Sequence, residues 1–529
     1  MTHPSASTLA ALLERRPYNA AADFIDANLA RGRKRKIAFA DDRRSLSYAD
    51  LQDGSHRFAS ALRASGLVAE SRMLLVLRDT VEFPVAFWGA IRAGVIPIPV
   101  NTLLTAEQYT YLLADSRAAA IVVAASLAPT VLSIRSRLEL LRTVIVVGAS
   151  RAERMQLGNV LYFEDLLEAA EPKALTAATL SDEVAFWMYT SGSTGDPKAV
   201  KHVHTSPMAS ALLMGQGVIG IRENDVAFSA AKLSFSYGLG NALFFPMSVG
   251  ASTVLLPERP TAAAVQAVLR EHQPTIFYAV PSLYAALLAQ PDLGRGAGSD
   301  RLRLCISAGE ALPANLGERW RAVVGIDVLD GIGSTEMLQT FLSNRPGDVR
   351  YGSTGKPVPG YEVKIVDENG HELPSGEIGE LMVRGPTAAE GYWNQRAKSR
   401  RTFAGEWTCT GDKFVCDHEG YYHYCGRTDD MFKVNGMWVS PFEVEAALLS
   451  HEAVLEAAVI GKPDGDGLIK PKAFIVLKQG YGADEQLLER LRLHVKERAG
   501  AWKYPRWIDI RPDLPRTATG KIQRYKLRE

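Results

Sequence analysis

The sequence has few cysteines, no long apolar run and almost no net charge. Four cysteines in 529 residues are too few for a disulfide framework, so we expect a reducing compartment. A transmembrane helix is not expected, because no run of about 18 apolar residues occurs. The 60 basic and 59 acidic residues nearly cancel, which gives no reason to expect nucleic acid or a membrane as a partner. Residues 1–16 lack a basic segment followed by an apolar one, so we expect no secretory signal and a cytoplasmic location.

The remaining composition is that of an ordinary globular protein, with 47% apolar and 22% charged residues. The chain is longer than one hydrophobic core supports, so more than one domain is expected. Up to about residue 345, short apolar runs alternate with amphipathic stretches such as 262–271 and 282–290. The apolar runs are residues 73–77, 120–123, 144–147, 184–188, 253–256, 276–280 and 302–306. This alternation predicts mostly parallel sheets covered by helices.

The last third of the chain has a different pattern. Strand-like residues 361–366 and 378–383 flank the turn-forming residues 368–370, which predicts a β-rich subdomain over about residues 350–428. After Asp429, Ser440 is expected to cap a helix, and the strands and charged helix that follow indicate a small α+β domain. We therefore predict an α/β fold with a large N-terminal domain, residues 1–428, and a small C-terminal domain, residues 429–529.

A loop rich in glycine and hydroxyl side chains follows the apolar run 184–188. Its glycines allow a tight turn that brings backbone N–H groups to an anion, and Lys198 adds positive charge. It is not a Walker loop, because Asp196 and Pro197 separate the last glycine from the lysine. The alternative is a flexible surface turn. We predict that this loop, comprising Thr190, Ser191, Gly192, Ser193, Thr194, Gly195 and Lys198, binds phosphate.

This loop resembles the signature of the adenylate-forming family, which includes acyl-CoA synthetases, peptide-synthetase adenylation domains and beetle luciferases. The segments 307–311, 331–336, 410–412, 426–430 and 519–521 resemble the family's other motifs and occur in the same order. The resemblance runs from about residue 45 to the C-terminus. It implies an ATP-dependent enzyme that forms an acyl-adenylate, with ATP, Mg²⁺ and coenzyme A as cofactors and co-substrates.

The resemblance also implies a role for individual residues toward ATP. Asp330 would accept from the adenine amino group, Asp412 would take the ribose hydroxyls, and Glu336 would ligate Mg²⁺. The full set assigned to ATP or AMP, beside the phosphate loop, is Ala308, Gly309, Glu310, Ala311, Asp330, Gly331, Ile332, Gly333, Ser334, Asp412 and Arg427. Taken singly, Asp412 could be a turn residue and Glu336 an acid in a first helical turn. Ile332 replaces the aromatic residue that is usual in the family, so aromatic stacking on adenine is not expected.

Catalysis is expected to use Lys521, Thr335 and Glu336. By resemblance, Lys521 bridges the carboxylate and the α-phosphate, although a lysine in a basic tail is usually only solvated. Asp429 resembles the family's hinge aspartate, about which a mobile C-terminal domain rotates between half-reactions. Lys433 and Gly436 would then line the thiol tunnel. The alternative for Gly436 is a simple turn.

Within the family the sequence most resembles benzoate-CoA ligases, in segments 230–241, 307–312 and 330–338. The residues expected at the aryl acid are Ala230, Tyr237, Ala308, Gly333, Gln339 and Thr340. Gln339 and Thr340 replace the His-Ile pair typical of benzoate-specific relatives. Because buried polar groups need partners, we expect a ring bearing hydroxyl or amino groups, or a heteroaryl acid. The alternative is that both side chains bond to backbone and benzoate is still preferred.

These features predict an AMP-forming acid–thiol ligase for benzoate or a substituted benzoate. Two other functions stay open: an enzyme that loads the aryl acid onto a carrier protein's phosphopantetheine, and a non-catalytic nucleotide-binding relative. The expected partners are a small aromatic carboxylic acid and coenzyme A, with neither nucleic acid nor membrane, in a monomer or homodimer.

Overall fold

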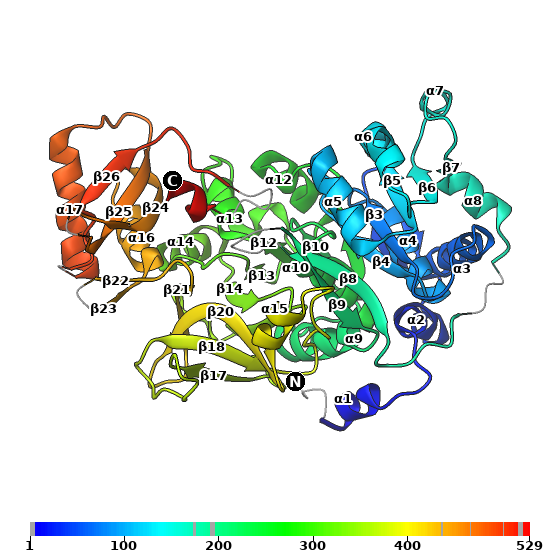
Figure 1. The fold of residues 1–529 in the computed structure, drawn as a ribbon, viewed down its shortest axis with the longest axis horizontal. Coiled ribbons are helices and arrows are strands. Elements are labelled where there is room, and N and C mark those ends of the chain that lie inside the picture. The colour runs from blue at the N-terminus through cyan, green and yellow to red at the C-terminus, as the bar shows by residue number, and fades with distance from the viewer. Residues whose placement is uncertain are drawn as a thin grey trace.

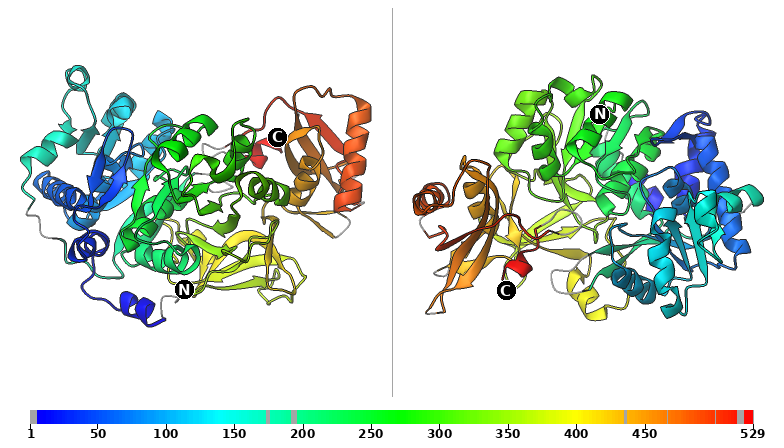
Figure 2. Two further views of the ribbon diagram at one scale, coloured as in Figure 1. Left: turned by 180° about the vertical axis from the view of Figure 1, so that it is seen from behind. Right: turned by 90° about the horizontal axis from the view of Figure 1, so that it is seen from above.

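The computed structural model describes residues 6–172, 176–190, 196–434, 437–465, 467–500, 502–516 and 522–528. Its elements form sheets covered by helices, a β-rich region, and a C-terminal group of strands and helices (Figure 1). In every view, the C-terminal elements, coloured orange to red, gather at the end of the molecule opposite the N-terminal elements, coloured blue to cyan (Figure 2). Within the described residues, none of the helices combines the length and apolar character that crossing a membrane requires.

The largest sheet has nine strands in the order β16-β15-β14-β13-β12-β10-β11-β1-β2. Its strands are β1 (Ile37–Ala40), β2 (Ser45–Ser47), β10 (Val226–Ser229), β11 (Ser252–Val254), β12 (Ile276–Ala279), β13 (Leu304–Ser307), β14 (Val328–Gly333), β15 (Thr340–Ser343) and β16 (Lys356–Pro357). The strands from β14 to β1 are parallel, and β15, β16 and β2 add antiparallel edges. Its covering helices include α12 (Ala262–His272), α13 (Pro281–Leu288) and α14 (Ala314–Val324). The predicted parallel, helix-covered architecture is confirmed here.

A second sheet is entirely parallel, in the order β4-β3-β5-β6-β7. Its strands are β3 (Arg72–Val76), β4 (Ile96–Pro99), β5 (Ala120–Ala124), β6 (Thr143–Val147) and β7 (Leu161–Tyr162). The helices of this region are α3 (Tyr48–Ala64), α4 (Glu82–Ala93), α5 (Ala106–Ser116), α6 (Ala128–Ile134), α7 (Arg151–Arg154) and α8 (Phe163–Ala169). Ser47 and Thr105 start α3 and α5 with capping boxes. Every residue of α4 is buried, so this helix belongs to the core of the large domain.

Helix α1 (Ala6–Leu13) lies at the periphery and is mostly exposed, with Leu12 buried. Other short helical segments complete the core between the sheets. They are η1 (Ala22–Asp26), α2 (Ala27–Ala30), α9 (Ser206–Ser210), η4 (Ala211–Ile219), α10 (Ser236–Leu239), η5 (Gly240–Phe244) and α11 (Phe245–Val249). The rings of Phe24, Trp88 and Phe244 meet there, with Phe24 stacked on Trp88 at 5.0 Å between centroids. This aromatic cluster joins segments that lie far apart in the sequence.

The strand that precedes the phosphate loop is placed differently from our expectation. β8 (Val184–Thr190) joins no parallel sheet; it pairs antiparallel with β9 (Lys198–Val203) as a hairpin. The reason is that Val200, His202 and Val203 are buried, so the segment after the loop also forms a strand. The phosphate loop therefore connects two strands, with residues 191–195 outside the described range.

The β-rich region contains β17 (Glu362–Val366), β18 (Gly379–Arg384), β19 (Phe403–Ala404), β20 (Trp407–Cys416) and β21 (Tyr422–Arg427), with α15 (Arg396–Thr402) beside them. All of its strand pairs are antiparallel, as the turn at residues 368–370 predicts for β17 and β18.

The C-terminal elements have a hydrophobic core of their own. They are β22 (Phe432–Val434), β23 (Met437–Val439), α16 (Pro441–Leu449), β24 (Val454–Pro463), β25 (Ile469–Leu477), α17 (Glu485–Ala499), β26 (Trp507–Ile510) and η7 (Arg524–Leu527). Ser440 caps α16, since its hydroxyl accepts from the Glu443 N–H at 3.1 Å. A separate α+β domain at this end agrees with the prediction. The exact boundary at residues 428 and 429, and rotation about it, stay predictions.

Candidate active site

The two stems of the phosphate-loop hairpin are held by α5. Thr190 and Lys198 face each other as cross-strand partners at the open end of the hairpin. Next to them, the Tyr189 hydroxyl donates to Asp115 at 2.6 Å, and the Tyr111 hydroxyl donates to the Pro197 carbonyl at 3.0 Å. The flanks of the loop are thereby fixed to a rigid helix. Ser191, Gly192, Ser193, Thr194 and Gly195 lie outside the described residues.

Lys198 and Glu336 are brought together by Tyr392. The Lys198 Nζ lies 4.4 Å from the centroid of the Tyr392 ring, within the range of a cation–π contact. The Tyr392 hydroxyl donates to Glu336 Oε1 at 2.7 Å. Burial lowers the pKa of Lys198, and the neighbouring Glu336 opposes this shift. The predicted phosphate ligand and the predicted metal ligand therefore share one neighbour, which the sequence did not reveal.

The backbone of Thr335 and Glu336 is also anchored. His202 Nε2 lies 2.8 Å from the Thr335 carbonyl oxygen, and the Ala389 N–H donates to the Glu336 carbonyl at 2.9 Å. Burial lowers the pKa of His202 to about 4, so the imidazole is neutral near pH 7 and donates from Nε2. These bonds fix the segment that follows β14, on which the predicted catalytic Thr335 and Glu336 lie.

Asp412 and Arg427 form an ion pair across β20 and β21. They are register partners, and Arg427 Nη1 lies 2.9 Å from Asp412 Oδ1. Asp412 is buried and raises the pKa of the exposed Arg427. The Thr410 hydroxyl accepts from the Asp412 N–H at 3.1 Å. Gly411 and Asp412 lie inside β20, with Gly411 at φ 70°, so Asp412 is a strand residue and not the turn residue considered as the alternative. Its role toward ribose stays a prediction.

Asp330 presents a buried acceptor at the end of the parallel sheet. It pairs in register with Ser307, the last residue of β13, and β14 continues beyond this pair to Gly333. Its Oδ1 is buried and has no hydrogen-bond partner within the described residues, and burial raises its pKa well above the ordinary value. A buried acceptor without a donor fits the exocyclic amino group of adenine. The residues present therefore fit the nucleotide.

The other predicted adenine-side residues follow the same two strands. Ala308 is buried directly after β13, and Gly309 adopts φ 93°, a left-handed conformation that favours glycine. Glu310 and Ala311 continue this turn, while Gly331, Ile332 and Gly333 belong to β14 and Ser334 follows it. Ile332 is half-buried, which leaves part of its surface free to cover a ring. The turn after β13 and the end of β14 both lie at the side of the sheet where the parallel strands have their carboxyl ends.

The side chains predicted for the acid lie around α10. Tyr237 donates from its hydroxyl to the Ile306 carbonyl at 3.2 Å and contacts Tyr278 edge-on at 6.5 Å between centroids. Ala230 is buried just after β10. Gln339 donates from Nε2 to the carbonyls of Ser236 and Tyr237.

The Gln339 amide is engaged at both ends. Its Oε1 accepts from the Thr340 N–H at 3.3 Å, beside the two bonds that Nε2 makes. A Cβ on Gly240 would lie 2.1 Å from Gln339 Nε2, so a glycine makes room for the amide. Gln339 therefore bonds to backbone as the alternative supposes, and the basis for expecting a polar substituent on the ring is lost for this residue. The rest of that alternative, for Thr340 and for benzoate as the preferred acid, stays a prediction.

Some predicted residues cannot be placed. Lys521 and Gly436 lie outside the described residues, and only the backbone of Lys433 in β22 is described. Asp429 follows β21, and its carbonyl accepts from Arg528 at 2.9 Å. The C-terminal segment thus contacts the predicted hinge.

A helix-covered α/β body, a hairpin that carries the predicted phosphate loop, the buried unpaired oxygen of Asp330 and a separate C-terminal domain are the features expected of an adenylate-forming enzyme. Residues 26–393 match the family described as AMP-binding enzyme, and residues 443–521 match the AMP-binding enzyme C-terminal domain. The chain belongs to the AMP-binding enzyme family, as its resemblance predicted.

Relatives match over nearly the whole length. A 4-hydroxybenzoate–CoA/benzoate–CoA ligase of Rhodopseudomonas palustris is 54% identical, covering 97% of this chain and 94% of the relative. A benzoate–CoA ligase of Thauera aromatica is 52% identical, with 97% and 96% covered. The crystal structure of a benzoate CoA ligase from Burkholderia xenovorans LB400 is 50% identical, covers 97% of this chain and 100% of its own, and has a TM-score of 0.89. The predicted similarity to benzoate-CoA ligases is confirmed.

Proposed function

We propose that the chain is an AMP-forming aryl-CoA ligase that converts benzoate, or a simple substituted benzoate, to its coenzyme A thioester with ATP. The observation that carries the proposal is the grouping of Lys198 and Glu336 around Tyr392 in a member of the AMP-binding enzyme family, and the buried acceptor of Asp330 in β14 supports it. The similarity to benzoate-CoA ligases over 97% of the chain supports the choice of acid and thiol. We further propose that it works in the cytoplasm as a monomer or homodimer.

The nucleoside is held by two aspartate side chains in this proposal. Asp330 accepts from the adenine amino group, while Ile332 covers the ring by dispersion. Asp412 accepts from the ribose hydroxyls, and its ion pair with Arg427 orients the carboxylate. These contacts fix the position of the α-phosphate relative to β14.

Lys198, Thr190 and the backbone of the phosphate loop bind the phosphates. Glu336 would hold Mg²⁺, a hard cation that binds carboxylate and phosphate oxygens and would neutralise charge on the leaving pyrophosphate. The carboxylate of the acid attacks the α-phosphorus, and the bond from phosphorus to the bridging oxygen of pyrophosphate breaks. No general base is needed, because the acid is already ionised. Thr335 donates to the α-phosphate as its charge develops.

The second half-reaction transfers the acyl group. The sulfur of coenzyme A attacks the acyl carbon, the bond from that carbon to the AMP oxygen breaks, and the thiol proton is released. We propose that residues 429–529 rotate about Asp429 between the steps, so that Lys521 serves adenylation and Lys433 and Gly436 serve thioester formation. The assignment of these four residues rests on their resemblance to family motifs.

A panel of acids tests the proposal. Coenzyme A consumption with ATP should be fastest, by kcat/KM, for benzoate, ahead of hydroxy- and aminobenzoates, pyridinecarboxylates and hexanoate. Benzoate should lead because the Gln339 amide is engaged by backbone. A hydroxy- or aminobenzoate in first place would restore the polar-ring hypothesis. Acid-dependent ATP–pyrophosphate exchange without coenzyme A consumption would favour loading of a carrier protein, and no exchange would favour a non-catalytic relative.

A further inference from the structure

Tyr392 is held in a fixed position between the phosphate-loop hairpin and Glu336. Its backbone segment runs antiparallel to β9: Tyr392 bridges Val200, and the Trp393 N–H donates to the Ala199 carbonyl at 2.9 Å. The ring is buried against Phe403, with 5.4 Å between centroids. A side chain restrained by both its backbone and its ring is able to orient its neighbours.

The ring face of Tyr392 is turned toward Lys198. The ammonium lies 4.4 Å from the ring centroid, in a region where burial already disfavours a positive charge. Other cations that add to this unfavourable field are Lys398, Arg401 and Arg427. The negative face of the ring offsets part of this repulsion and keeps Lys198 at the mouth of the hairpin when no phosphate is bound.

The hydroxyl of Tyr392 is turned toward Glu336. It donates to Oε1 at 2.7 Å, and Thr402 Oγ1 of α15 lies 3.4 Å from the Tyr392 hydroxyl oxygen. A hydrogen bond to a charged carboxylate fixes which oxygen of Glu336 is left for another ligand. One side chain thus contacts both the residue proposed for phosphate and the residue proposed for the metal.

We propose that Tyr392 is a positioning residue that sets Lys198 and Glu336 in the correct relative geometry for MgATP. Its ring orients the lysine and its hydroxyl orients the carboxylate, so the two functions are separable. The inference rests on the proposed function only in taking MgATP as the ligand of this site.

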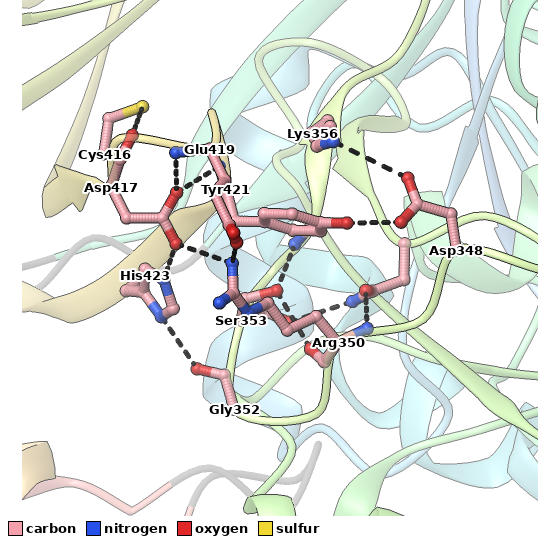
Figure 3. A network of polar contacts seen from close by, with 12 residues as sticks. Asp348, Arg350, Gly352, Ser353, Lys356, Cys416, Asp417, Glu419, Tyr421 and His423 are labelled. Carbon is pink, nitrogen blue, oxygen red and sulfur yellow. Dashed lines mark hydrogen bonds and ion pairs between the residues drawn. The ribbon is translucent and has the colours of Figure 1, made fainter. Parts of the chain in front are cut away.

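The β-rich region supplies a matched control in Tyr421. Lys356 Nζ lies 4.1 Å from the Tyr421 ring centroid, and the Tyr421 hydroxyl donates to Asp348. Figure 3 shows the Tyr421–Asp348 bond and the ion pair between Lys356 and Asp348 in a polar network, and none of its labelled residues is assigned to ATP. Tyr421 therefore has the same kinds of partner as Tyr392, a lysine on its ring and a carboxylate on its hydroxyl, and is not among the residues assigned to ATP, the acid or coenzyme A.

Calorimetric titration of ATP, with chelator and at a series of Mg²⁺ concentrations, tests the proposal on Tyr392→Phe and Tyr392→Leu. Loss of the hydroxyl in Tyr392→Phe should raise the Mg²⁺ concentration required for half-maximal tightening of ATP binding by about tenfold. ATP binding in chelator should stay near that of the wild type. Tyr392→Leu should in addition weaken ATP binding in chelator by about threefold, because the cation–π contact is lost. The same two substitutions at Tyr421 should change neither the Mg²⁺ dependence of ATP binding nor the affinity for ATP in chelator.

The outcomes separate this inference from the proposed function. Wild-type Mg²⁺ dependence in Tyr392→Phe, or equal shifts in the Tyr421 variants, would overturn the positioning role. A wild-type protein that shows the expected Tyr392 dependence but turns over no acid would contradict the proposed function alone. Absence of MgATP binding by the wild type would contradict both.

Discussion

Removal of Arg524 should loosen the C-terminal domain, because it breaks a buried ion pair. Arg524 donates to both oxygens of Glu445, at 2.6–3.0 Å, and the Glu445 side chain is 6% exposed. In Arg524→Ala the Glu445 carboxylate would still accept a hydrogen bond from the Val459 N–H, at 2.7 Å. It would lose the cation that pairs with both of its oxygens. Loss of one partner of a buried pair destabilises by roughly 3 kcal/mol or more, since the remaining charge is left desolvated.

Amide hydrogen exchange measures this effect locally, which suits a chain of more than one domain. Amides of α16 and β24 should exchange about a hundredfold faster in Arg524→Ala, as about 3 kcal/mol implies. Arg492→Ala is the control, because Arg492 pairs with the exposed Glu485 and Glu489 of the same domain and should change exchange little. Adding Glu445→Gln to Arg524→Ala should recover much of the loss.

The reasoning would be refuted if Arg524→Ala exchanged no faster than Arg492→Ala. It would also be refuted if the double variant were less stable than the single one, since the uncompensated charge is then not the cause.

Other predictions concern the two half-reactions and the dependence on pH. Lys521→Ala should abolish most acid-dependent ATP–pyrophosphate exchange while sparing thioester formation from preformed adenylate. Equal loss of activity in both assays would contradict the role of Lys521 in adenylation. Asp429→Pro should leave that exchange largely intact and impair thioester formation, and unimpaired thioester formation would rule out the hinge role. Burial raises the pKa of Asp79 to about 6, so the folded state loses stability as pH rises from the unfolded value toward 6. The melting temperature of Asp79→Asn, relative to the wild type, should therefore rise between pH 4 and 7, and parallel profiles would contradict this origin.

Local patterns in the sequence predicted much of the fold. Apolar runs matched strands such as β5 and β6, and the pattern at Ser440 matched the start of α16, because strand burial and helix capping involve residues close in sequence. The β8–β9 hairpin was missed because an apolar run followed by a glycine-rich loop also precedes many helices. Only the burial of the next segment distinguishes the two arrangements.

The site was predictable where ordered motifs marked it and not where tertiary contacts build it. Tyr111, Asp115 and Tyr392 were not predicted, because a tyrosine or aspartate in a helix or loop has many roles and these contacts join distant segments. Gln339 was recognised as a polar residue in need of a partner. The sequence could not show that its partners are the carbonyls of Ser236 and Tyr237 rather than a ligand.

Transfer of a carboxylate oxygen to AMP tests the central claim most directly. Benzoate labelled with heavy oxygen in its carboxylate, incubated with ATP, Mg²⁺ and coenzyme A, should yield benzoyl-CoA and AMP that carries one heavy oxygen. This transfer follows because the attacking oxygen stays on the α-phosphorus when the thiol displaces AMP. Unlabelled AMP, or label in pyrophosphate or phosphate, would contradict activation through an acyl-adenylate.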